Sequence, residues 1–161
     1  MLDRRALLAG GALAAITGVA MRSGGGAAAA AETFPYKLTD AEWRKRLSPQ
    51  AYQVLRHEDT ERPFSSPLDH LFKKGAYSCA GCGLANYSSA TKFDSGTGWP
   101  SFWRPLPNAV ATRKDGSLMM VRTEVHCRRC GGHLGHVFND GPQPTGLRYC
   151  MNGLALKFTA A

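Results

Sequence analysis

The sequence lacks a long hydrophobic run, a dense block of Lys and Arg beyond its first residues, and any low-complexity tract after Ala31. The longest weakly apolar stretch, residues 6–21, is shorter than the roughly 20 residues that a helix needs to cross a bilayer, so a membrane anchor is the weaker alternative there. The formal net charge of +8 is interpreted as a solvated basic surface, because nucleic-acid sites gather their basic residues. With 43% hydrophobic and 20% charged residues in 161 positions, the composition is typical of one soluble globular domain.

Residues 1–31 are predicted to be an export signal and residues 32–161 the folded domain. Arg4 and Arg5 precede a weakly apolar Ala/Gly/Leu segment, and an Ala-rich stretch ends at Ala31. This order is typical of secretory signals, and the adjacent arginines indicate the twin-arginine type. We expect a periplasmic protein with no stable membrane insertion after export.

The pattern after Ala31 predicts a mainly β fold with a small helical preface. Thr39 and Glu42 form a capping box, which predicts a helix to about Leu47, and Ser48-Pro49 predicts a second helix through His57. From Gly75 onward, short apolar runs alternate with Gly and Pro, which favours antiparallel strands. The expected strands are 75–79, 110–113 returning as 117–125 through a turn at 114–116, and a final pair formed by 147–152 and 155–158.

Cysteine is scarce, and four of the five cysteines form two Cys-x-x-Cys pairs, Cys79/Cys82 and Cys127/Cys130. Two-residue spacing lets both sulfurs of a turn face one ion, so the four thiolates predict a single structural Zn²⁺ that staples distant strands. Two disulfides are the alternative that export favours, but each would close a very small loop. A redox-active Cys-x-x-Cys in a disulfide-handling enzyme is a further alternative, and metal analysis separates it from zinc binding.

The fifth cysteine, Cys150, stands apart in the segment Arg-Tyr-Cys-Met-Asn. Asn152 follows two residues later, on the same face of a strand. Trp99 lies in a Gly- and Pro-rich turn, and His133 and His136 lie three residues apart after the second Cys-x-x-Cys pair. Each of these has an ordinary structural explanation taken singly: packing for Trp99, a metal-adjacent role for the histidines, and a buried inert thiol for Cys150. Their combination favours a reactive thiol.

From about Leu38 to Phe158 the chain resembles the B-type peptide methionine sulfoxide reductases, which are specific for the R epimer. Four ordered motifs carry the resemblance: Cys79-Ala80-Gly81-Cys82-Gly83, Lys92-Phe93-Asp94-Ser95-Gly96-x-Gly98-Trp99-Pro100-Ser101-Phe102, His133-Leu134-Gly135-His136-Val137-Phe138 and Arg148-Tyr149-Cys150-x-Asn152. The resemblance implies two antiparallel sheets around one core, with zinc at the end remote from the thiol.

By this resemblance Cys150 is the catalytic thiolate that attacks the sulfoxide sulfur of methionine sulfoxide in peptides or proteins. His136, His133 and Asn152 would polarise the sulfoxide oxygen and deliver a proton. The products would be methionine and a sulfenic acid on Cys150, so the expected role is protein repair under oxidative stress.

Trp99 and Phe138 would bind the substrate, with the indole face against its terminal methyl group. Many relatives carry a second, resolving cysteine where this chain has Thr97. We therefore expect no intramolecular disulfide step, and an external reductant, either a thioredoxin-like protein or a small thiol. A zinc-ribbon-like module that binds nucleic acid remains the alternative from another class; it would show steeply salt-dependent binding and no need for Cys150.

Overall fold

The structure is a computed structural model that describes residues 32–116 and 121–161. The export signal predicted for residues 1–31 therefore lies outside the described residues, and so does the segment 117–120. Within the described part, no helix combines the length and the apolar character required to span a bilayer.

Two short helices open the described chain, as the capping signals predict. Helix α1 (Asp40–Arg46) begins at the capping box, where the Thr39 and Glu42 side chains each bond the other residue's main chain. Helix α2 (Pro49–His57) has Ser48 as its N-cap and proline in its first turn. Both helices turn apolar residues to the interior, namely Trp43 from α1 and Ala51, Tyr52, Val54 and Leu55 from α2.

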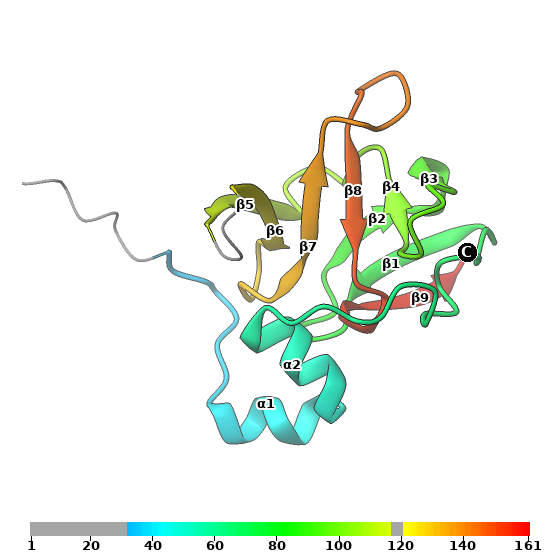
Figure 1. Cartoon of the computed structure of the whole chain (residues 1–161). Helices are drawn as coiled ribbons and strands as arrows, with labels where there is room; N and C mark the ends of the chain where they lie inside the picture. Colours follow the sequence, from blue (N-terminus) through cyan, green and yellow to red (C-terminus); the bar gives the residue numbers. More distant parts are fainter. Residues whose placement is uncertain (1–31, 117–120) are drawn as a thin grey trace, which may run out of the picture. The chain divides into compact units, whose positions relative to one another are not determined.

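The rest of the chain forms two antiparallel sheets, which confirms the predicted mainly β fold (Figure 1). A three-stranded sheet has the order β2-β1-β9, from β1 (Gly75–Cys79), β2 (Ala85–Ser88) and β9 (Leu156–Ala160). A six-stranded sheet has the order β3-β4-β8-β7-β6-β5, from β3 (Lys92–Phe93), β4 (Ser101–Phe102), β5 (Val110–Asp115), β6 (Arg122–Cys127), β7 (His133–Phe138) and β8 (Arg148–Met151). Short 3₁₀ turns, η1 (Ser89–Thr91) and η3 (Gly153–Ala155), precede β3 and β9.

Aromatic side chains join the two sheets in one core. Tyr87 of β2 stacks on Phe102 of β4 with ring centroids 4.4 Å apart. Tyr77 of β1 contacts the edge of Phe102 at 5.0 Å and lies against Phe158 of β9 at 5.1 Å. Aromatic pairs of this kind contribute about 0.5–1.5 kcal/mol each beyond the area that they bury. Side chains from both sheets thus close over a single interior.

The prediction that strands 147–152 and 155–158 pair with each other is wrong. Strand β8 pairs with β4 and β7, whereas β9 pairs with β1 in the other sheet. The turn η3 carries the chain across, and the buried carboxylate of Glu61 accepts the N–H groups of Gly153 and Leu154 within it. A tight hairpin would have kept both strands in one sheet. Here the N–H groups of the turn bond to Glu61, which lies about 90 residues earlier in the sequence, and the two strands join different sheets.

Strands β5 and β6 are antiparallel as predicted, but their ladder includes residues predicted to form the turn. The ladder extends to the pair Asp115 and Arg122, so Lys114 and Asp115 belong to β5 and not to a tight Asp-Gly turn. Strand β6 correspondingly begins at Arg122, and the first part of the predicted 117–125 strand lies outside the described residues.

Candidate active site and metal centre

The four cysteines of the two Cys-x-x-Cys pairs come together at one buried point. Cys79 ends β1 and Cys127 ends β6, so the two pairs come from different sheets. Their four Sγ atoms lie within 4.8 Å of one another. The nearest approaches run between the pairs, 3.7 Å from Cys79 to Cys130 and 3.5 Å from Cys82 to Cys127, and all four are free thiols.

This arrangement fits a tetrahedral thiolate site for zinc. A Zn–S distance of about 2.3 Å gives sulfur–sulfur edges of about 3.8 Å, close to the distances observed here. Hydrogen bonds among the four thiols give them different pKa values. Contact with Cys130 lowers the pKa of Cys127, and contact with Cys127 raises the pKa of Cys79. A bound cation would stabilise all four as thiolates and would hold the two sheets together.

Cys150 lies outside this group, at the centre of the six-stranded sheet. On β8 it is directly opposite Ser101 of β4 on one side and His136 of β7 on the other. Directly opposite residues have Cβ atoms about 4.5–5.5 Å apart, so both residues begin their side chains beside that of Cys150. The same row continues from His136 to Glu124 of β6 and then to Arg113 of β5. Cys127 lies three residues beyond that row on β6, which separates the metal group from the thiol as the resemblance implies.

A β-bulge brings both histidines to the same face. Val125 pairs with Gly135, but the next residue, His126, pairs with His133, so β7 holds one extra residue at Leu134. Without it, side chains three apart in a strand would point to opposite faces. The two rings instead meet edge to face, with centroids 5.3 Å apart.

Each histidine is held by a carboxylate. Nδ1 of His133 donates to Glu124 at 2.8 Å, and Nε2 of His136 donates to Asp115 at 2.7 Å. Nε2 of His133 is buried and has no hydrogen-bond partner among the described residues. Burial lowers the pKa of His136 although the Asp115 bond opposes it, so the resting imidazole is neutral near pH 7. The ring then presents Nδ1 as an acceptor.

Hydroxyl groups line the other side of the thiol. Oγ1 of Thr97 lies 3.8 Å from Sγ of Cys150. Ser95 links it to the sheet, with hydroxyl contacts of 2.8 Å to Thr97 and 2.7 Å to Ser101. Burial raises the pKa of Cys150, and Thr97, Arg148 and Ser101 lower it in part. The guanidinium of Arg148 is itself held in a two-pronged ion pair with Asp140, at 2.9 and 2.8 Å.

The remaining predicted site residues surround this row. Asn152 follows β8 and uses both ends of its amide: Oδ1 accepts the Glu61 N–H at 3.0 Å, and Nδ2 donates to the Leu134 carbonyl at 3.3 Å. The half-buried Trp99 donates its indole N–H to the Glu61 carbonyl at 3.1 Å. Phe138 lies two residues after His136 on β7, with their ring centroids 6.5 Å apart.

Sequence reasoning missed the residues that orient this site, chiefly Glu124, Asp115, Ser101 and Glu61. Ser101 lies within one of the four motifs without a role of its own there, and no motif marks Glu124, Asp115 or Glu61, because each reaches its partner through sheet register or a long-range contact. The alternation of β6 could have placed Glu124 on the face shared with His126, but the bulge that delivers His133 to it is invisible in the sequence.

The comparisons with known proteins agree with this geometry. The family model described as "SelR domain" matches residues 47–160. The chain is 53% identical over 121 residues to a protein named "Peptide methionine sulfoxide reductase MsrB" from Agrobacterium fabrum, covering 74% of this chain and 90% of that relative. Relatives of the same name from Leptospira interrogans (53% over 121 residues, 74% and 92% covered) and Bradyrhizobium diazoefficiens (55% over 120 residues, 74% and 86% covered) match similarly. With Cys150 opposite His136 in the sheet and a separate four-sulfur group already in place, these matches establish that the chain belongs to the SelR family of B-type peptide methionine sulfoxide reductases.

Proposed function

We propose that this chain reduces the R epimer of methionine sulfoxide in peptides and proteins, and that Cys150 is its reactive thiol. The observation that carries the proposal is the position of Cys150. It is the one cysteine outside the metal group, and it is paired with Ser101 of β4 and His136 of β7 in the middle of the sheet. Family membership supports the reaction class.

The first step is transfer of the thiol proton. A buried thiol with a raised pKa and a neutral imidazole opposite it form a Cys–His pair, in which Nδ1 of His136 can accept the proton of Cys150. The resulting thiolate is the nucleophile, and the hydroxyl of Thr97 and the charge of Arg148 stabilise it. Asp115 holds the imidazolium that forms, because its carboxylate already accepts the Nε2–H bond.

The second step uses the same proton. The thiolate attacks the sulfoxide sulfur while His136 returns the proton to the sulfoxide oxygen. The attack forms a bond between Sγ of Cys150 and the substrate sulfur, which now carries a hydroxyl group. This hydroxyl then passes to Sγ while the bond between the two sulfurs and the substrate S–O bond break, which leaves a sulfenic acid on Cys150 and releases the substrate as a thioether. The second amide hydrogen of Asn152 helps to polarise the oxygen, and His133 does so when Nε2 also carries a proton, because Nδ1 already donates to Glu124. Trp99 and Phe138 form apolar walls for the methyl end of the substrate.

An external thiol regenerates the enzyme. Thr97 stands where the resemblance places a resolving cysteine in many relatives, and the other four cysteines belong to the metal group. One thiol of the reductant displaces water from the sulfenic acid to give a mixed disulfide, and a second thiol releases Cys150. The reductant is a thioredoxin-like protein or a small thiol, and the cycle serves protein repair under oxidative stress.

A single structural zinc ion would be held by Cys79, Cys82, Cys127 and Cys130. With four thiolates the coordination shell is closed, so the ion would contribute stability and no chemistry at the thiol. Its position at the ends of β1 and β6 would tie the two sheets together.

Export through the twin-arginine pathway to the periplasm is part of the proposal, supported by Arg4-Arg5 and the weakly apolar segment after them. Replacement of both arginines by lysine should keep a fused reporter in the cytoplasm, because this route reads the paired arginines. Export of the reporter without them would contradict the assignment.

The decisive experiment is an assay with separated R and S sulfoxide peptides and dithiothreitol as reductant. We expect turnover of the R epimer alone, and none by Cys150→Ser although that variant keeps its zinc. Oxidised enzyme treated with a sulfenic-acid probe should carry the label on Cys150. A disulfide between Cys150 and one of the metal-group cysteines would contradict the proposed regeneration.

A further inference from the structure

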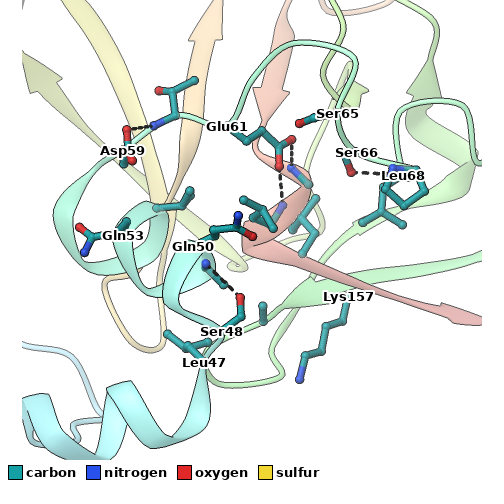
Figure 2. Close-up of a pocket in the computed structure, with 18 of the residues that line it drawn as sticks. Leu47, Ser48, Gln50, Gln53, Asp59, Glu61, Ser65, Ser66, Leu68 and Lys157 are labelled. Carbon is teal, nitrogen blue, oxygen red and sulfur yellow. Dashed lines mark hydrogen bonds between the residues drawn. The ribbon is translucent and has the colours of Figure 1, made fainter.

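Glu61 is a buried carboxylate that belongs to none of the sequence motifs. It lies in the segment between α2 and β1, and only 7% of its surface is exposed. Its two oxygens accept the N–H groups of Gly153 at 2.5 Å and Leu154 at 2.8 Å. Figure 2 shows this carboxylate on the wall of a cavity of 860 Å³ between α2, the 59–68 segment and the start of β9. The side chain therefore fixes Glu61 against the turn η3, directly after Asn152.

The main chain of Glu61 reaches two of the proposed site residues at once. Its N–H donates to Oδ1 of Asn152 at 3.0 Å, and its carbonyl accepts Nε1–H of Trp99 at 3.1 Å. Asn152 and Trp99 come from different motifs: Asn152 directly follows β8, and Trp99 precedes β4. Among the described hydrogen bonds, those of Glu61 are the direct link between them.

We propose that Glu61 is a positioning residue for the reduction: its carboxylate anchors its own main chain to η3, and that main chain sets the orientation of the Asn152 amide and the Trp99 indole. This inference rests on the function proposed above.

The donors and acceptors of these hydrogen bonds allow only one orientation of the Asn152 amide and of the Trp99 indole. An amide can be turned end for end at little steric cost, but here the Glu61 N–H faces one end and the Leu134 carbonyl faces the other. That pairing fixes the amide nitrogen of Asn152, with its second hydrogen, in one place. The indole of Trp99 has a single donor, so its bond to Glu61 fixes the ring orientation in the same way.

The rest of the 59–68 segment packs onto the same two neighbours. A Cβ added to Gly153 would lie 1.9 Å from Oγ of Ser66, so the segment covers η3 closely. Phe64 donates its N–H to the carbonyl of Gly98 at 2.7 Å, beside Trp99. Phe64 does so with φ of 62°, a conformation that is costly for a bulky residue and persists only where surrounding contacts impose it. The segment is thus built to bridge the turn of Trp99 and the turn after Asn152.

Burying the carboxylate of Glu61 costs free energy, so its two hydrogen bonds are needed to hold it in place. Burial raises the pKa of this carboxyl, and only the bonds from Gly153 and Leu154 oppose that effect. Glutamine at this position would keep one oxygen acceptor but would place an NH₂ donor against the second N–H group. The anchor would then be loosened without a change in side-chain size.

The test compares Glu61→Gln with Asp59→Asn, a matched change two residues earlier. Asp59 is exposed, and its Oδ1 bond to the Thr60 N–H survives in asparagine. For each zinc-loaded molecule of Glu61→Gln we expect kcat/KM for the R sulfoxide peptide to fall about 100-fold, with both a lower kcat and a higher KM, because small misplacements of site groups cost that much. Asp59→Asn should match the wild type.

The second readout is the indole N–H resonance of Trp99, assigned with Trp99→Phe. In Glu61→Gln this resonance should move, while those of Trp43 and Trp103 should stay. An unchanged kcat/KM, or an unmoved Trp99 resonance, would overturn the inference. Should Glu61→Gln fail to fold, Glu61→Asp, which is too short to reach both N–H groups, is judged by the same two criteria. If the wild-type protein shows no turnover that depends on Cys150, the proposed function is contradicted. If the wild type is active and Glu61→Gln is equally active, only the proposed positioning role of Glu61 is contradicted.

Discussion

Cys150 and His136 are directly opposite each other on neighbouring antiparallel strands, β8 and β7. This pairing puts a thiol whose pKa is raised by burial next to an imidazole whose pKa is lowered by burial. In the proposed mechanism, proton transfer from Cys150 to His136 creates an ion pair from these two groups.

His136→Ala should lower turnover by about 10²- to 10⁴-fold, the range for a general acid–base group. Zinc content should stay at one ion per chain, because the imidazole is bonded to Asp115 and not to the four sulfurs. Steady-state kinetics with zinc analysis checks this, and His70→Ala at an exposed position serves as the control. Zinc loss on removal of His136 would assign this histidine to the metal centre.

Thr97→Val should raise the pKa of Cys150 further. The hydroxyl 3.8 Å from Sγ lowers this pKa, and valine has the same shape without a hydroxyl. A higher pKa means less thiolate at a given pH, so alkylation of Cys150 should slow at pH 8 and its pH profile should move upward. Thr97→Ser retains the hydroxyl and should follow the wild type. A downward move with valine would contradict the assigned sign.

Removal of zinc should unfold the domain rather than silence the thiol alone. The four sulfurs come from the ends of β1 and β6, and without a cation their thiolates repel one another across the two sheets. Addition of a strong chelator should lower the unfolding temperature and abolish cooperative melting. Cys79→Ser should behave like the chelated protein. A chelated domain that melts as before would mean that the sheets hold together without the ion.

Gly135→Ala should destabilise the protein strongly. A Cβ at this position would lie 2.1 Å from the carbonyl oxygen of Cys150, so β7 and β8 could not pair as they do. We expect a loss of several kcal/mol in the free energy of unfolding, more than the roughly 0.5–3 kcal/mol of an ordinary substitution. Denaturant unfolding measures it, with Gly116→Ala as control because nothing lies within 4 Å of its added Cβ. Equal stability of the two variants would show that the strands can separate at no cost.

The sequence correctly predicted the features that depend on interactions between neighbouring residues. The capping box at Thr39 and the Ser48-Pro49 start specify helix ends through bonds within one turn, and both helices form where expected. The Cys-x-x-Cys turns likewise specify two sulfurs each, and the alternation after Gly75 predicts strands. The strand pairing failed at β8 and β9, because the sequence shows that two strands follow each other but not which sheet each one joins.

The sequence by itself predicted which residues can bind a metal, which thiol is the candidate nucleophile, and which aromatic and imidazole groups accompany it. Only the tertiary structure decided the orientation of these groups. The extra residue at Leu134 turns His133 to the face of His136, and Glu61 reaches across from the segment after α2 to Asn152 and Trp99. Both effects depend on register and on long-range hydrogen bonds, which exist only once buried donors and acceptors must find partners away from water.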